Sequence, residues 1–163
     1  QPEFTRAVLR NCRAECMHTA IETSFFAPWE TIKSILPYVN LAFVDMKFFS
    51  NDLHKQYTGV DNELIKQNLL ATNELEDKFQ LVIRTPIIPG LNDSEEELCK
   101  IGEFCTKLKK LSYVQLLPYH KLGTATYEKL GRTYALPDIK SPTPDQMADY
   151  VKIIERYVEN VIF

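Results

Sequence analysis

Short apolar runs alternate with amphipathic segments along most of this chain. Four of the runs have the length and apolar content of buried strands, and we expect them over residues 18–24, 40–47, 79–88 and 113–119. The segments between them place apolar residues at helical spacing. Strands that alternate with helices in this way predict βα units built around a parallel sheet.

The expected helices begin and end at recognisable caps and breaks. They cover residues 2–16, 28–36, 51–57, 62–75, 95–109 and 144–159. Ser94 and Glu97 have the spacing of a capping box, and Thr143 precedes a proline at the first position of the last helix. Residues 123–144 are expected to be irregular, and residues 161–163 fit either a short strand or a packed tail.

About four βα units and a C-terminal helix are too few to close an eight-stranded barrel. The predicted fold class is therefore α/β, either an open sheet or one arc of an incomplete (β/α) barrel with parallel strands. The 163 residues are enough for one core, so we expect a single domain over residues 1–163.

Composition narrows the possible partners. The net charge of −3 argues against binding to nucleic acid, and the apolar runs are far shorter than the roughly 18 residues of a membrane span. Four cysteines in a chain with an ordinary apolar content of 45% favour reduced thiols. We therefore expect a cytoplasmic protein with neither nucleic acid nor membrane among its partners.

Ionisable or hydrogen-bonding side chains stand at the end of each expected strand. They are Glu22, Thr23 and Ser24 on the first, Asp45 and Lys47 on the second, Arg84 on the third and His120 on the fourth. Parallel α/β sheets hold their chemistry at this carboxyl edge. Asp45 and Lys47 would share one face of an extended strand, which favours a ligand clamp.

Lys47 supports two kinds of chemistry and one alternative without a ligand. A desolvated lysine forms a Schiff base with a carbonyl substrate, whereas a charged one binds a carboxylate or a diol. The alternative is an ion pair, either between Asp45 and Lys47 or across strands. Placing Arg84 and His120 at the same rim favours a ligand, because buried polar groups are costly without a partner.

The roles of Glu22 and His120 are each open to more than one interpretation. Glu22 and Asp45 offer oxygen ligands for a shared cation, or else are two separately paired carboxylates. His120 fits a general base, a ligand-binding donor or a core histidine, and its place where the chain leaves the sheet favours ligand contact. His54 falls on a polar helix face and is expected to be structural.

The cysteines do not have the spacing of a cluster site. Cys12 and Cys16 form CxxxC, but the third thiolate of a CxxxCxxC loop would fall at Thr19, which cannot serve. Buried thiols on a helix face are the better interpretation, and Cys99 and Cys105 likewise suit the interior of their helix.

Several motifs, taken in order, resemble one family across the whole chain. They are Gln1-Pro2-Glu3-Phe4, residues 18–26, Val44-Asp45-Met46-Lys47, Arg84 with Pro89-Gly90, and Leu116-Leu117-Pro118-Tyr119-His120. The chain resembles the glycyl-radical-enzyme activating enzymes of the radical S-adenosylmethionine superfamily, most of all the pyruvate formate-lyase activating type.

The resemblance implies an incomplete α/β barrel and a ligand site at the carboxyl ends of its strands. It implies reductive cleavage of S-adenosylmethionine by a [4Fe–4S] cluster, with a glycyl radical enzyme as partner and flavodoxin or ferredoxin as electron donor. Asp45, Lys47 and His120 would contact S-adenosylmethionine and Arg84 would help to hold it. Thr23 and Ser24 would line the adjacent strand end.

The chain departs from this family at two points. The cluster-binding CxxxCxxC and the GGEP segment are absent, so we expect the C-terminal part of a partial barrel, inactive by itself. Phe25 stands where the family usually has glycine, and we expect it to be strained or to crowd the ligand. The alternatives are a Schiff-base lyase that uses Lys47 and a non-catalytic partner-binding domain.

Overall fold

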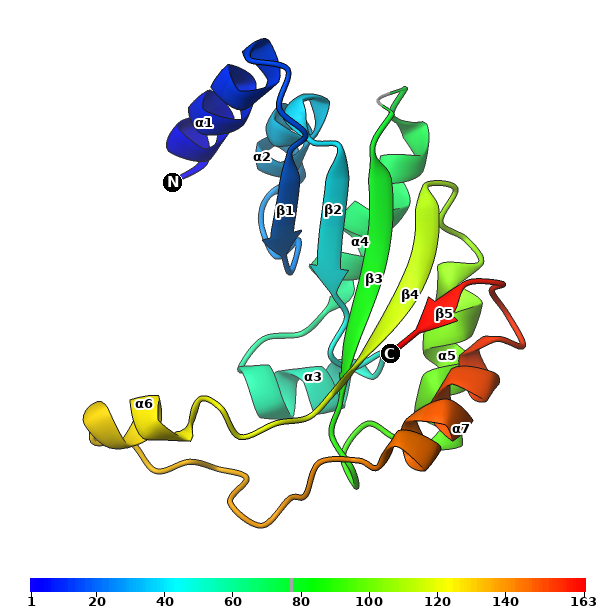
Figure 1. Ribbon diagram of the computed structural model, residues 1–163. Coiled ribbons are helices and arrows are strands. Elements are labelled where there is room, and N and C mark those ends of the chain that lie inside the picture. The colour runs from blue at the N-terminus through cyan, green and yellow to red at the C-terminus, as the bar shows by residue number, and fades with distance from the viewer. Residues whose placement is uncertain (77) are drawn as a thin grey trace.

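The computed structural model describes residues 1–76 and 78–163. Its helices, 3₁₀ turns (η) and strands follow one another along the chain (Figure 1). They are α1 (Pro2–Ala14), β1 (Ala20–Thr23), α2 (Trp29–Ile35), η1 (Leu36–Tyr38), β2 (Leu41–Asp45), α3 (Asn51–Thr58), α4 (Glu63–Ala71), η2 (Thr72–Glu74), β3 (Gln80–Ile87), α5 (Glu95–Cys105), β4 (Leu111–Pro118), α6 (Thr124–Lys129), α7 (Pro144–Ile154) and β5 (Val161–Ile162).

One sheet of five parallel strands organises the chain, in the order β1-β2-β3-β4-β5. Because each strand neighbours the next one in sequence, the sheet grows in one direction, as an arc of a barrel does. Figure 1 shows α4 and α5 behind the sheet and α3 at the carboxyl ends of the strands. The predicted α/β class is confirmed, and the arrangement is consistent with a partial barrel.

The two faces of the sheet differ in burial. Strand β2 alternates buried Ala42 and Val44 with half-buried Phe43 and Asp45. Ala42 and Val44 belong to the same hydrophobic cluster as Ile101 of α5, so this side of the strand packs under the helices. Successive side chains of a strand point to opposite faces, which turns Asp45 away from that cluster.

Most elements lie where the sequence predicts them, and their ends differ. Helix α5 ends at Cys105 rather than at 109, because Lys107 and Leu108 donate to the carbonyls of Phe104 and Cys105 in tighter, three-residue turns. Helix α6 occupies part of the stretch that we expected to be irregular. The C-terminal residues form a short fifth strand.

The predicted N-caps Ser94 and Thr143 are confirmed, but the capping box expected between Ser94 and Glu97 is only half formed, because the Glu97 side chain bonds elsewhere. The side chain of Thr143 accepts from the backbone of Gln146, whose side chain accepts from the backbone of Thr143, which completes a capping box. Ser94 accepts from the N–H of Glu97 at 3.2 Å. Among the described helices, none has both the length and the apolar character needed to cross a membrane.

Candidate functional site

Arg84 connects the ends of three strands. Its Nε donates to Oδ1 of Asp45 at 3.1 Å, and a terminal guanidinium nitrogen donates to Oε2 of Glu22 at 3.0 Å. Asp45 is its register partner on β2, and Glu22 lies on β1. The cation between the two carboxylates is therefore the guanidinium of Arg84 in this structure.

The three charged side chains Glu22, Asp45 and Arg84 differ in exposure, and their contacts shift two of their pKa values. The Arg84 side chain is 14% exposed, against 27% for Asp45 and 69% for Glu22. The hydrogen bond from Arg84, helped by its charge, lowers the pKa of the Glu22 carboxyl below its usual value near 4.5. The same bond is the main factor that raises the pKa of Arg84, so the guanidinium stays charged.

Lys47 lies two residues beyond the end of β2, in a half-buried position. It lines a cavity of about 130 Å³ together with Ser24, Asp45 and residues of α3. The described residues form no ion pair with Lys47, and Oδ1 of the neighbouring Asp45 is bound by Arg84. Of the ion pairs that the sequence allowed, the one across strands is present and the Asp45–Lys47 pair is not.

His54 lines the same cavity, although the sequence pattern assigned it to a polar helix face. That assignment is wrong, since His54 is only 4% exposed. Its ring Nδ1 lies 2.7 Å from the carbonyl oxygen of Val60 and 3.0 Å from Oγ1 of Thr58. His54 is thus part of the cavity wall, and its ring is hydrogen-bonded to Val60 and Thr58.

Lys47 also lines a second, more aromatic cavity of about 300 Å³. Its lining includes Phe48, Tyr57, Tyr119 and Tyr134. The hydroxyls of Tyr119 and Tyr134 are hydrogen-bonded to each other, and burial together with this bond raises the pKa of Tyr119 to about 12. Tyr119 was named only as part of a motif and given no role, although strand alternation places it on the same face as Leu117.

His120 and Thr23 lie differently from the other predicted residues. His120 is exposed two residues beyond β4, and its Nδ1 accepts from the N–H of Leu122 at 3.4 Å. It is not among the described residues that line either cavity at Lys47. Thr23 accepts from the N–H of Phe25 at 3.1 Å, so its hydroxyl supports the turn after β1.

Phe25 has the left-handed backbone conformation that was expected where the family usually has glycine. Its φ is 56°, in the left-handed region that favours glycine, so the expected strain is present. Its ring is 2% exposed and belongs to the hydrophobic core, whereas Phe26 lines the cavity at Lys47. The amide of Asn68 donates to the carbonyls of Phe25 and Ala27, at 2.8 and 2.9 Å, and holds the turn.

The cysteines are four free thiols in different surroundings. The expectation of buried helix-face thiols holds for Cys105, but Cys16 is exposed, with φ 56°, beyond the end of α1. Within residues 1–76 and 78–163, no three side chains of His, Cys, Asp or Glu are grouped so as to hold a metal ion. The donor groups within these described ranges therefore do not fit a [4Fe–4S] cluster.

Three curated proteins to which this chain is similar are all named as activating enzymes. No family model matches the chain. It is 35% identical to the indoleacetate decarboxylase activating enzyme of Tractidigestivibacter scatoligenes, over 96% of this chain and 49% of that protein. It is 40% identical to the isethionate sulfite-lyase activating enzyme of Nitratidesulfovibrio vulgaris, over 85% and 45%. It is 36% identical to the 4-hydroxyphenylacetate decarboxylase activating enzyme of Clostridium scatologenes, over 98% of this chain and 50% of that protein.

A solved structure agrees with these relatives. A domain of pyruvate-formate lyase-activating enzyme from Bacteroides vulgatus superposes with a TM-score of 0.80 at 26% identity, covering 99% of this chain and 91% of that domain. The chain is homologous to the glycyl-radical-enzyme activating enzymes of the radical S-adenosylmethionine superfamily. It spans about half the length of the curated relatives that it matches.

Proposed function

We propose that this chain supplies the S-adenosylmethionine-binding part of an enzyme that introduces a glycyl radical into a partner enzyme, as the C-terminal part of a partial barrel. One observation carries the proposal: the Lys47 ammonium forms no ion pair among the described residues, yet shares a cavity with the Asp45 carboxylate. The methionine carboxylate of the ligand needs a cation, and its ribose hydroxyls need an acceptor. The names of the homologues support this interpretation, since all are activating enzymes.

Each residue has a separate task in this proposal. Lys47 binds the ligand's carboxylate and Asp45 accepts from a hydroxyl, while Arg84 fixes the orientation of Asp45. Ser24 lines the cavity and His120 contacts the ligand from the exposed rim. Thr23 acts through the turn that it holds.

The chemistry of the whole protein extends beyond these residues. Radical S-adenosylmethionine activating enzymes use S-adenosylmethionine and a [4Fe–4S] cluster. S-adenosylmethionine held by Asp45 and Lys47 would, given one electron from a reductant outside this chain and with loss of methionine, supply the 5′-deoxyadenosyl group for hydrogen abstraction from the partner's glycine. Because the described cysteines do not fit a cluster, we assign no step through it to this chain. We expect residues 1–163 alone to be inactive and to bind the ligand weakly, and propose flavodoxin or ferredoxin as the electron donor.

Calorimetric titration of the full-length protein with S-adenosylmethionine tests the site. We expect Lys47→Ala to raise the Kd by at least about tenfold, which corresponds to the loss of one charge-assisted contact. Lys55→Ala is the matched control, because Lys55 is exposed on α3. An unchanged Kd in Lys47→Ala would refute the proposed site.

The Schiff-base alternative is not favoured by the relatives. Borohydride treatment with a carbonyl substrate would trap an adduct on Lys47 if this chemistry operated. We expect no adduct.

A further inference from the structure

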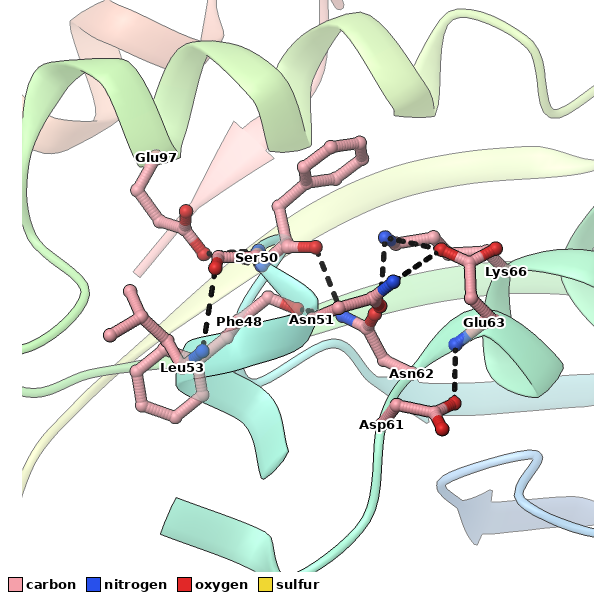
Figure 2. A network of polar contacts seen from close by, with 10 residues as sticks. Phe48, Ser50, Asn51, Leu53, Asp61, Asn62, Glu63, Lys66 and Glu97 are labelled. Atoms are coloured by element: carbon pink, nitrogen blue, oxygen red, sulfur yellow. Dashed lines mark hydrogen bonds and ion pairs between the residues drawn. The ribbon is translucent and has the colours of Figure 1, made fainter. Parts of the chain in front are cut away.

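The turn between β2 and α3 is held by side chains from three other parts of the chain. Oε1 of Glu97, on α5, accepts from the N–H groups of Phe49 and Ser50, the latter at 3.1 Å. The amide nitrogen of Asn62 donates to the carbonyls of Phe48 and Phe49, at 2.6 and 3.1 Å. Figure 2 shows Glu97 and Asn62 reaching the turn from opposite sides.

Lys47 itself is held from a third direction. The amide nitrogen of Asn92 donates to the carbonyl of Lys47 at 2.8 Å and to that of Pro86, on β3, at 2.7 Å. All these contacts are to the main chain, so they fix the path of the backbone whatever the side chains of the turn. The backbone from Lys47 to Ser50 is therefore held before any ligand binds.

The carboxylate of Glu97 is in an unusual place. Glu97 is 5% exposed, and glutamate is almost never fully buried without partners. Its position three residues after Ser94 predicts a capping box. Its side chain bonds instead to the turn after β2, where Phe49 lies 48 residues earlier in the chain. The N–H of Glu97 still donates to Ser94, so only one half of the box is used for the helix.

The place where the Glu97 carboxylate bonds indicates that it positions the turn after Lys47 and does not merely stabilise its own helix. The side-chain cap of α5 comes from Ser94, whereas the Glu97 carboxylate bonds to Phe49 and Ser50, outside its own helix. The bonds end two and three residues after Lys47, in the segment that orients this lysine between its two cavities. A shift of about 1 Å at such a residue is enough to weaken ligand contact strongly.

We propose that Glu97 is a positioning residue, which orients Lys47 toward S-adenosylmethionine by holding the N–H groups of Phe49 and Ser50. This inference rests on the proposed function of Lys47. It predicts that loss of the Glu97 carboxylate acts on ligand binding through Lys47 and not in addition to it.

A double-mutant cycle in the full-length protein, read by calorimetric titration with S-adenosylmethionine, tests the proposal. We expect Glu97→Ala to raise the Kd by about tenfold, and Glu97→Gln to restore it to within about threefold, because the amide oxygen still accepts both N–H groups. The Lys47→Ala and Glu97→Ala changes together should weaken binding no more than Lys47→Ala alone. Glu96→Ala is the control, since Glu96 is exposed on the same turn and pairs with Lys100.

The outcomes separate this inference from the proposed function. If Lys47→Ala weakens binding while Glu97→Ala does not, Glu97 is not a positioning residue and the ligand site stands. Fully additive effects in the double variant would also overturn the inference. If Lys47→Ala leaves the Kd unchanged, the ligand site itself is refuted. Should Glu97→Ala not fold, Glu97→Asp withdraws the oxygen by one methylene and is expected to raise the Kd in the same way.

Discussion

Asp45 and Arg84 are register partners on neighbouring parallel strands, and their side chains form an ion pair across β2 and β3. The pair removes the acidic partner that Lys47 would otherwise have had two residues away. The same guanidinium also binds Glu22 on β1, so one arginine ties together three strand ends. This arrangement leaves the lysine as the group available to an anion.

Replacing Arg84 with alanine should destabilise the protein. Asp45 would lose its partner while staying largely shielded from water, so we expect a loss of about 1.5–3 kcal/mol in the free energy of unfolding, measured by urea denaturation. Lys100→Ala removes an exposed ion pair, which solvent screens, and should lower the free energy of unfolding by clearly less. Equal effects of the two substitutions would contradict a special role for Arg84.

The Glu22–Arg84 pair should make stability depend on pH. The pKa of Glu22 is lowered in the folded protein, so its contribution is present above the unfolded value near 4.5 and is lost as the pH falls through the folded value. We expect wild type to be more stable than Glu22→Gln at pH 7 and the difference to disappear in acid. Chemical denaturation of both proteins across this range measures it, and a difference that persists unchanged at pH 2 would argue against it.

Phe25 should show two opposing effects that a pair of variants separates. Phe25→Ala removes a buried ring and keeps a Cβ at φ 56°, and we expect it to lose about 3–5 kcal/mol. Phe25→Gly removes the same ring but also the steric cost of the left-handed conformation, so it should be about 1 kcal/mol more stable than the alanine variant. Thermal or urea unfolding provides the comparison, and an alanine variant that is the more stable would exclude backbone strain.

The cysteines should differ sharply in reactivity. Burial raises the pKa of the Cys105 thiol to about 12, so almost none of it is thiolate at neutral pH, while Cys16 is exposed. Alkylation followed by mass spectrometry should label Cys16 in the native protein and Cys105 only after denaturation. Early labelling of Cys105 would mean that α5 opens locally.

Predictions from the sequence succeeded where one local pattern decides the outcome. The apolar run over residues 40–47 predicts a strand, and β2 lies within it, although only Ala42 and Val44 are buried where burial on both faces was expected. Arg84 was expected at the same rim because parallel strands meet at one edge, and it lies there. The end of β2 at Asp45 was not predictable, and it places Lys47 in the turn rather than on the strand.

Side chains with more than one possible partner were not resolved by the sequence. Asp45 lies close in sequence to Lys47, but it pairs with Arg84, which is 39 residues away. Glu97 has the spacing of a helix cap, yet its carboxylate reaches the turn at Phe49 and Ser50. His54 was assigned to a polar helix face, but it is the buried residue of α3 and lines the cavity at Lys47, because α3 lies at the carboxyl ends of the strands.

The sequence by itself determined the α/β class, the parallel strands and the set of polar residues at their carboxyl ends, because periodicity and capping act between near neighbours. Only the tertiary structure decided which of these groups pair, and therefore that Lys47 is left without an ion pair among the described residues. It also decided that Glu97, Asn62 and Asn92 hold the turn after β2. The physical reason is that a hydrogen bond needs atoms within about 3 Å, and the fold alone brings together groups that are distant in sequence.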